Sequence, residues 1–432
     1  MTATTPTRPL LYAAGSNGRG QLATTDMQDA HSFTACTFDG CQRGTLPEGT
    51  LSIIAVRCGG NHSLALLSRH HRTQVWGCGD GTKGQLGPAY VHEAGNNCAI
   101  FRPISLPLED HGLSEYEISD VAACWETTFF VLTQHGEHDV LISMGGDDFG
   151  DLGIGGLGTL NSTRKASPFH IIDFTHVMGP VAHRLSITDI VAGPHHAVAL
   201  LRSGNKQHIV GWGAARHGQL GSLFAPSGRT LPFAPSPVAI NLPIDVQLDP
   251  VCSVRVGNQH SLYLHASGRV SALGSDSKGQ LRGIHIVEGV QTIGCSWNGS
   301  YLRSHLGLLS TGADARGQLG RDGAAETHLR PVNIPDTPRV IDFMCGSEHV
   351  LCLLESEGHT EVWGWGWNEH GNLATGSLDD VKVPLRIWPR ERGETGEAVG
   401  VWAGCGTSWV AVSFPASLTI LDSGDLISSG SR

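Results

Sequence analysis

Four histidines recur in similar surroundings along the chain, and imidazole is a common zinc ligand. They are His62, His196, His260 and His349. A zinc ion needs its ligands gathered at about 2.0–2.1 Å, whereas equivalent residues of a repeat lie far apart in different units. We therefore expect each imidazole to hydrogen-bond a neighbouring turn rather than to bind a metal.

The eleven cysteines offer little for metal or redox chemistry. No Cys-x-x-Cys pair occurs, and Cys36 and Cys41 form a loose pair that no second pair matches. Cys58, Cys295 and Cys345 lie at repeated positions, where we expect them to pack as small apolar residues in the core. An odd number of cysteines and a polar N-terminus indicate reduced thiols, and hence a cytoplasmic or nuclear protein.

Two further features resemble ligand-binding motifs, but neither has the residues needed to predict a ligand. The segment Gly15–Gly20 is spaced like a phosphate loop, but no Gly-Lys-Ser/Thr ending and no long helix follow it, and the pattern recurs seven times. Asp147, Asp148 and Asp151 could bind calcium, although acidic turns more often explain such a cluster. No Ser-His-Asp order or carboxylate pair supports catalysis. We therefore expect no enzyme activity and no cofactor.

Tryptophans at turns form the remaining candidate site. Trp125, Trp297 and Trp409 lie in or beside turns, and three more crowd the predicted strand Trp363–Trp367, where alternation could align them in one aromatic stripe. Turn aromatics favour protein interfaces, and core packing is the alternative. Together with neighbouring acidic residues and histidines, the predicted partner-binding set is Trp125, Glu126, Trp297, Glu348, His349, Trp365, Trp367, Glu369, His370 and Trp409.

Two sequence blocks that could position these residues alternate along the chain, seven copies of each. The first is an apolar strand, a glycine and a polar loop that ends in Gly-Gln-Leu or a variant of it. Its copies end at Leu22, Leu86, Leu152, Leu220, Leu281, Leu319 and Leu373. The second is two β-like runs around a turn of small residues, clearest in Ile53–Leu66. Its other copies are centred on Trp125, His196, His260, Trp297, His349 and Trp409.

The blocks predict four short strands per unit. Alternating apolar residues such as Ile54 and Val56 give a strand one buried face, and the intervening turn makes a hairpin. The leucine of each Gly-Gln-Leu is expected to pack between neighbouring units. The spacing is uneven, with insertions at residues 88–113, 153–184 and 222–250 and a short step from Leu281 to Leu319.

The predicted fold is therefore all-β, a seven-bladed β-propeller over residues 10–414. A flexible segment precedes it at residues 1–9, and an extension follows at residues 415–432. The ring could be closed by Leu10–Gly15 or by Asp425–Gly430. We favour the N-terminal strand, because its Gly-Gln-Leu tail is complete.

Charge and hydropathy exclude two classes of partner. The chain has 29 Lys and Arg against 40 Asp and Glu, a formal net charge of −11. Because phosphate binding needs a basic footprint, direct nucleic-acid binding is disfavoured. No apolar run is long enough to span a membrane.

Gly15–Leu22 and Cys58–Leu66 resemble the regulator of chromosome condensation repeat, and the resemblance covers nearly the whole chain. Within that family the chain looks like the fungal alpha-tubulin suppressor, or killer-toxin-insensitivity, propellers. The segments that carry this finer resemblance are Cys58–Ser63, Gly77–Asp80, Ala123–Thr128, Cys295–Trp297, Gly346–His349, Trp363–Gly366, Asn368–Asn372 and Gly404–Trp409.

The resemblance implies a monomeric propeller that forms a heterodimer with a small zinc-binding electron carrier. Such a pair would support diphthamide formation and Elongator-dependent modification of the wobble uridine of tRNA. The alternative is nucleotide exchange on a small GTPase, the activity of the family's namesake, although no basic tail or wedge is evident. Light sensing is disfavoured, because Trp125 and Trp297 are followed by Glu126 and Asn298 rather than by arginine.

Overall fold

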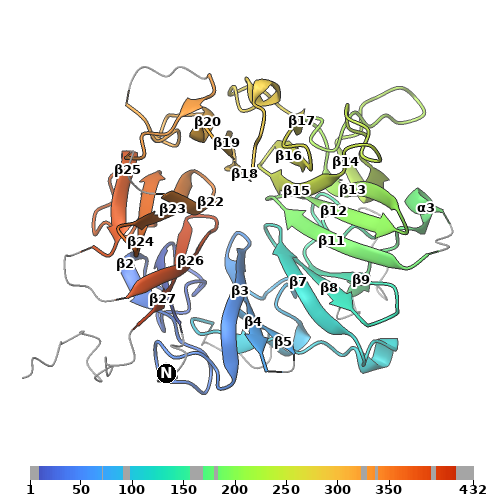
Figure 1. Cartoon of the computed structure of the whole chain (residues 1–432). Helices are drawn as coiled ribbons and strands as arrows, with labels where there is room; N and C mark the ends of the chain where they lie inside the picture. Colours follow the sequence, from blue (N-terminus) through green and yellow to red (C-terminus); the bar gives the residue numbers. More distant parts are fainter. Residues whose placement is uncertain are drawn as a thin grey trace, which may run out of the picture.

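Seven antiparallel sheets surround a central axis, as the ring in Figure 1 shows. The computed structural model describes residues 9–70, 72–90, 98–155, 169–179, 183–322, 328–335, 339–390 and 396–414. Each sheet is one blade, and its first strand in the ring lines the axis. The predicted all-β, seven-bladed propeller is therefore confirmed.

We number the blades in chain order, starting with the first sheet whose strands are consecutive in the sequence; the blade that combines both ends of the chain comes last. Blade 1 is β3 (Thr50–Cys58), β4 (His62–Arg69), β5 (Thr73–Gly79) and β6 (Arg102–Pro103). Blade 2 is β7 (Glu117–Ala123), β8 (Thr127–Thr133), β9 (Val140–Gly145) and β10 (His170–Ile171). Blade 3 is β11 (Leu185–Ala192), β12 (His196–Ser203), β13 (Lys206–Ala214) and β14 (Phe233–Ala239).

The other blades follow the same order from the axis outward. Blade 4 is β15 (Val251–Val256), β16 (His260–His265) and β17 (Val270–Gly274). Blade 5 is β18 (Thr292–Cys295), β19 (Gly299–Ser304), β20 (Gly307–Gly312) and β21 (Arg330–Pro331). Blade 6 is β22 (Arg339–Cys345), β23 (His349–Ser356), β24 (His359–Gly366) and β25 (Val381–Trp388). Blade 7 is β26 (Glu397–Ala403), β27 (Thr407–Ser413), β1 (Leu10–Gly15) and β2 (Ala30–Ala35).

Helical structure in the described residues is confined to single turns. The named ones are η1 (Glu109–His111), α3 (Thr175–Met178) and η2 (Ile284–Ile286), and residues 88–90 are also helical. None of the helices in the described ranges has the length and apolar character needed to cross a membrane. All eleven cysteines are described, and all are free thiols.

The N-terminal strand closes the ring, as predicted. β1 pairs antiparallel with β27, from Leu10 opposite Val412 to Gly15 opposite Thr407. Leu11 and Ala411 are both buried in the cluster that joins blade 7 to blade 1. The competing segment Asp425–Gly430 lies outside the described residues.

The leucine of the first block seals the joints between blades. Leu22, Leu86, Leu220 and Leu373 are all at most 1% exposed. Leu22, for example, packs with residues of blade 1 although it belongs to blade 7. The carbonyl of the preceding glutamine also accepts hydrogen bonds across the joint, as from Trp365 Nε1 to Gln318 O at 2.9 Å. Each joint is therefore stabilised both by the buried leucine side chain and by a hydrogen bond to the glutamine carbonyl.

Candidate protein-interaction site

Turns between the first and second strands of the blades meet around one mouth of the central channel. Their backbones bond from blade to blade: Gly60 N to Trp125 O at 2.9 Å, Trp125 N to Pro194 O at 2.9 Å, and Trp297 N to Ser347 O at 2.7 Å. Pro194 has no N–H, and no such bond links its turn to that of blade 4 among the described residues. This belt fixes the backbone positions from which the side chains of the mouth project.

Two tryptophans from opposite sides of the ring meet over this mouth. Trp125, after β7, and Trp297, after β18, have ring centroids 6.1 Å apart at an interplanar angle of 43°. Both are only partly buried. Beneath them is a cavity of about 120 Å³, lined mainly by glycine, alanine, serine and cysteine. A partner approaching this face would meet an aromatic platform at the centre of the ring.

The cavity also changes the expectation for the repeated cysteines. Cys295 is buried as predicted, but Cys58 and Cys345 are only partly buried and line the cavity with Cys295, Cys124 and Cys405. The physical reason is that they end the strands that face the channel rather than strands inside a blade. Burial raises the pKa of the Cys58 and Cys345 thiols, which favours their protonated form.

Two carboxylates stand at equivalent positions beside the mouth. Glu126 lies 3.8 Å from Lys83 Nζ, a contact between partly exposed groups. Glu348 accepts a hydrogen bond from Gln318 Nε2 at 3.3 Å, and burial raises the pKa of its carboxyl. The turns around the channel mouth thus carry two acidic side chains, Glu126 and Glu348. The cation beside Glu126 is Lys83, which belongs to the loop after β5.

A second group lies on the same face, in the loop that follows β24. Trp367 Nε1 donates to Glu369 Oε2 at 3.1 Å, and the Trp367 ring meets the His370 ring edge-on at 5.2 Å. His370 Nδ1 lies 2.7 Å from Asp29 Oδ2 of blade 7. Trp367 N donates to Glu348 O at 2.9 Å, so this group adjoins the mouth through the turn of blade 6.

Three members of the predicted partner-binding set are inside the propeller. Trp365, Trp409 and His349 are each 0% exposed. Trp365 and Trp409 lie on middle strands, whose side chains face the adjoining blades rather than the turns. We therefore leave these three out of the candidate surface. They match the alternative of core packing.

The expected aromatic stripe does not form. β24 ends at Gly366, so Trp367 belongs to the loop beyond the strand. Trp365 is buried, while Trp363 is half-buried and donates from Nε1 to Glu361 Oε2 at 2.8 Å. Only Trp367 of the three reaches the face that carries Trp125.

His195 and Phe149 also belong to this face, and the sequence analysis missed them. The His195 ring lies 6.2 Å from Trp125 and 4.4 Å from Phe149, and Phe149 is 38% exposed. Burial lowers the pKa of His195, which keeps the ring neutral. Its place in the repeat is that of Glu126 and Glu348. This repeat position could have indicated from the sequence that His195 lies on the same face as Glu126 and Glu348.

The four repeated histidines are structural. Each ring nitrogen Nε2 lies 3.0–3.2 Å from a hydroxyl oxygen in the following blade. The expected hydrogen bond to a neighbour is therefore confirmed, but its partner is on a strand rather than in a turn. Among the described residues, no group of three or more His, Cys, Asp or Glu is arranged to hold a metal.

The acidic loop of blade 2 bonds its own backbone. Asp147 Oδ1 accepts from Leu152 N at 3.0 Å, and Asp151 Oδ2 accepts from Phe149 N at 3.3 Å. This matches the interpretation as an acidic turn. Asp151 stands where five of the other loops have glutamine and one has Asn372, and burial raises the pKa of its carboxyl to about 7.

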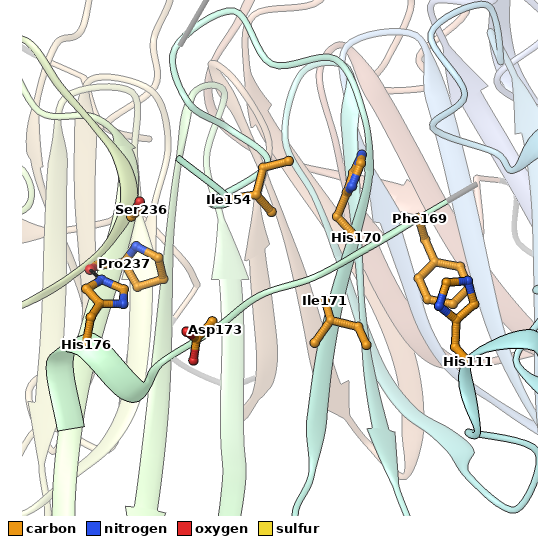
Figure 2. A pocket seen from close by; sticks show the side chains of 10 residues that line it. His111, Ile154, Phe169, His170, Ile171, Asp173, His176, Ser236 and Pro237 are labelled. Carbon is orange, nitrogen blue, oxygen red and sulfur yellow. Dashed lines mark hydrogen bonds between the residues drawn. The ribbon is translucent and has the colours of Figure 1, made fainter. Parts of the chain in front are cut away.

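A larger groove of about 490 Å³ opens on the outside, between blades 2 and 3. Figure 2 shows its histidines, His111, His170 and His176, at separate points of the wall. Asp173 accepts from Thr175, and His176 Nε2 lies 2.7 Å from Pro237 O. Because these groups do not converge on a common point, we assign the groove no chemistry.

Comparison with known proteins identifies the repeat. Residues 53–85 and 307–353 match the regulator of chromosome condensation (RCC1) repeat. A bovine secretion-regulating guanine nucleotide exchange factor is 26% identical over 92% of this chain and 82% of its own length. An RCC1 repeat-containing protein of Schizosaccharomyces pombe is 26% identical over 93% and 99%.

Solved structures show the same fold. Human WBSCR16 superposes with a TM-score of 0.70 at 19% identity, covering 94% of this chain and 99% of its own. Yeast Prp20p gives 0.68 at 17% identity, covering 98% and 94%. Two segments of the chain thus match the RCC1 repeat and its fold is that of these propellers, which supports the broader resemblance. The finer resemblance to the alpha-tubulin suppressor propellers stays a prediction.

Proposed function

We propose that this RCC1-like propeller acts by binding partner proteins at the channel mouth, and not by catalysis. The observation that carries the proposal is the Trp125–Trp297 pair, which bridges blades 2 and 5 and is only partly buried. Large aromatics of this kind dominate the energetics of protein interfaces. The belt of backbone bonds holds them in place before a partner arrives, which reduces the entropic cost of binding.

The partner we propose is a small zinc-binding electron carrier of diphthamide synthesis and Elongator-dependent tRNA modification, in the cytoplasm or the nucleus. Support comes from where the resembling segments lie. Ala123–Thr128, Cys295–Trp297, Gly346–His349 and Gly404–Trp409 come from four blades and are far apart in sequence. All four contribute to the lining of the same cavity below the tryptophan pair.

Affinity purification from the native cells tests this proposal. We expect the small zinc protein to co-purify near one to one with the full chain. Trp125→Ala and Trp297→Ala should each reduce its recovery at least tenfold, the share of affinity that a central aromatic carries. Leu306→Ala is the matched control, because Leu306 is 59% exposed and lies in the turn between β19 and β20, at the opposite ends of the strands from Trp297. Unchanged recovery with both tryptophan variants folded would overturn the proposal.

A second candidate is nucleotide exchange on a small GTPase. It is favoured by the similarity to the bovine exchange factor over most of both chains. A release assay with fluorescent GDP on a panel of small GTPases separates the two functions. Accelerated release that Trp125→Ala abolishes would establish exchange at the same face, whereas no acceleration with any GTPase leaves the adaptor role.

A further inference from the structure

Blade 4 has three strands, whereas the six other blades have four. All residues from 183 to 322 are described, so this stretch of chain supplies no fourth strand for β17. The short step from Leu281 to Leu319 explains the difference, because the connection turns through η2 instead of extending. The outer edge of β17 is therefore open where every other blade is paired.

The other blades show which backbone groups this opening leaves unpaired. Ala272 is equivalent to Gly77 and Gly364, which pair with Arg102 and Leu385 of their fourth strands. In blade 1 the outward groups alternate, with Val75 O accepting from Ile104 N and Gly79 N donating to Cys98 O. The corresponding groups of blade 4 are those of Val270, Ala272 and Gly274, and no described residue pairs with them across this edge.

A second feature, the clearance around the loop glycines, agrees with the missing strand. The glycine of the Gly-Gln-Leu loop usually abuts the fourth strand of the following blade. A Cβ on Gly20 would lie 2.8 Å from Ala99, on Gly150 2.5 Å from Pro235, and on Gly317 2.5 Å from Lys382. The corresponding glycine facing blade 4 is Gly218, and nothing lies within 4 Å of its Cβ position. Gly84, which faces the two-residue fourth strand of blade 2, is open in the same way.

Charge at this opening indicates what would fill it. The residue before the loop glycine is His370 in blade 6 and Arg316 in blade 5, and each meets an aspartate just before the next blade's fourth strand. His370 Nδ1 lies 2.7 Å from Asp29 Oδ2, and Arg316 NH1 lies 3.3 Å from Asp380 Oδ2.

His217 occupies the corresponding place beside blade 4. It is exposed, as is its neighbour Arg216, and neither forms an ion pair with any described residue. Arg216 and His217 at this opening could therefore pair with an acidic residue, and no described residue supplies one.

Part of the edge is already covered. Ile284 of η2 is 1% exposed and packs in the same cluster as Val270. Ile286, two residues on, is 71% exposed. The connection thus fills the apolar core of the joint, but no described residue pairs with the outward hydrogen-bonding edge of β17.

We propose that an extended segment of a partner protein adds to β17 as the antiparallel fourth strand of blade 4. Strand addition at an open edge is an established mode of peptide recognition. The segment would carry an acidic residue facing His217 and Arg216. Asp29 precedes Thr34, which pairs with Ala13, and Asp380 precedes Leu385, which pairs with Gly364, by the same five positions. The acidic residue of the partner should therefore lie five positions before the residue opposite Ala272.

This site is separate from the channel mouth and stands whether or not the proposed function holds. The probe is a fluorescent peptide with the sequence of residues 380–388, Asp-Val-Lys-Val-Pro-Leu-Arg-Ile-Trp, which is the fourth strand of blade 6 with its aspartate. Binding to the full chain is measured by anisotropy. We expect saturable binding that weakens when the peptide carries Asp380→Asn or when the protein carries His217→Glu.

The decisive pair of variants changes the edge itself. Ala272→Pro removes the outward N–H at a position where an edge strand tolerates proline, and we expect it to weaken peptide binding at least tenfold. Ala272→Ser keeps the N–H and should bind like the wild type. Slowed hydrogen exchange at residues 270–274 on peptide addition would locate the contact.

Three results would overturn the proposal. One is no binding at peptide concentrations up to about 1 mM. The second is equal binding to the Ala272→Pro and Ala272→Ser proteins, both verified as folded by circular dichroism. If Ala272→Pro does not fold, the charge variant decides, and unchanged binding to His217→Glu is then the contrary result.

Discussion

His62 Nε2 in blade 1 lies 3.0 Å from Thr128 Oγ1 in blade 2, and both groups are buried. The same pairing joins His196 to Ser261, His260 to Ser300 and His349 to Ser408. Where the histidine is missing, the hydroxyl is usually missing too: Thr127 is followed in the next blade by Ala197, and Gly299 by Val350. Histidine and hydroxyl thus form one inter-blade unit, because a buried polar group without its partner is costly.

Removing one member of this unit should weaken the ring. We expect His62→Ala to lower the free energy of unfolding by about 1–3 kcal/mol, because it leaves the Thr128 hydroxyl buried without a partner. Urea denaturation followed by circular dichroism measures the effect. His305→Ala, at an exposed histidine, is the control, and an equal loss in the two variants would contradict the assignment.

The same histidines should make the propeller sensitive to acid. Burial lowers the pKa of His62, His260 and His349 from 6.5 to about 4, and that of His196 to about 3. Their unfolded forms take up protons first, so stability is fully present above pH 6.5 and falls as the pH drops toward 4. Each histidine contributes a slope of about 1.4 kcal/mol per pH unit. Unfolding curves at several pH values should show this slope, reduced in His62→Gln.

Asp151→Gln should stabilise the protein at neutral and alkaline pH. Asp151 Oδ1 is buried without a partner, and burial raises the pKa of this carboxyl from 3.8 to about 7. Its contribution is favourable below pH 3.8 and is lost as the pH rises through 7, where the buried group must ionise. Glutamine has no charge and can accept from the loop backbone, as Gln85 Oε1 does from Lys83 N at 2.9 Å.

We expect a gain of about 1–3 kcal/mol at pH 8 from Asp151→Gln, shrinking toward pH 4. Asp148→Asn, at an exposed acid of the same loop, should change little. A gain that is the same at both pH values would show that burial of the charge is not the cause.

Two tryptophan variants should separate the core from the candidate interface. Trp365→Ala removes a buried ring and its bond to Gln318 O, and should cost about 3–5 kcal/mol of stability. Trp125→Ala should cost no more than about 1 kcal/mol, because its ring is partly exposed. Thermal unfolding compares the two. Equal losses would mean that Trp125 is a core residue and would weaken the case for a partner at the mouth.

Closure of the ring by β1 predicts strong sensitivity near the N-terminus. Leu11→Asp places a charge in the cluster between blades 7 and 1, and we expect a loss of more than about 4 kcal/mol. Leu51→Asp, at a leucine that is 52% exposed, is the control. Chemical denaturation of both proteins gives the comparison, and a small loss for Leu11→Asp would argue against closure by this strand.

The sequence by itself determined the number of blades and the placement of the turns, whereas its prediction of four strands per unit is wrong for blade 4. These follow from local rules: alternation sets the buried face of a strand, and glycine-rich segments turn the chain. It also marked Trp125, Glu126, Trp297 and Glu348 as turn residues, and all four lie on one face. The short step from Leu281 to Leu319 was visible as well, although the sequence did not show that it removes a strand.

Only the tertiary structure decided which of these residues are available. Trp125 and Trp409 look alike in sequence, but one projects from the innermost turn and the other packs between blades. Distance from the axis makes that difference, and it depends on how neighbouring blades pack rather than on local spacing. The open edge of β17 has the same origin. The edge is open because η2 packs Ile284 into the cluster of Val270 instead of pairing with the strand, and no described strand takes its place.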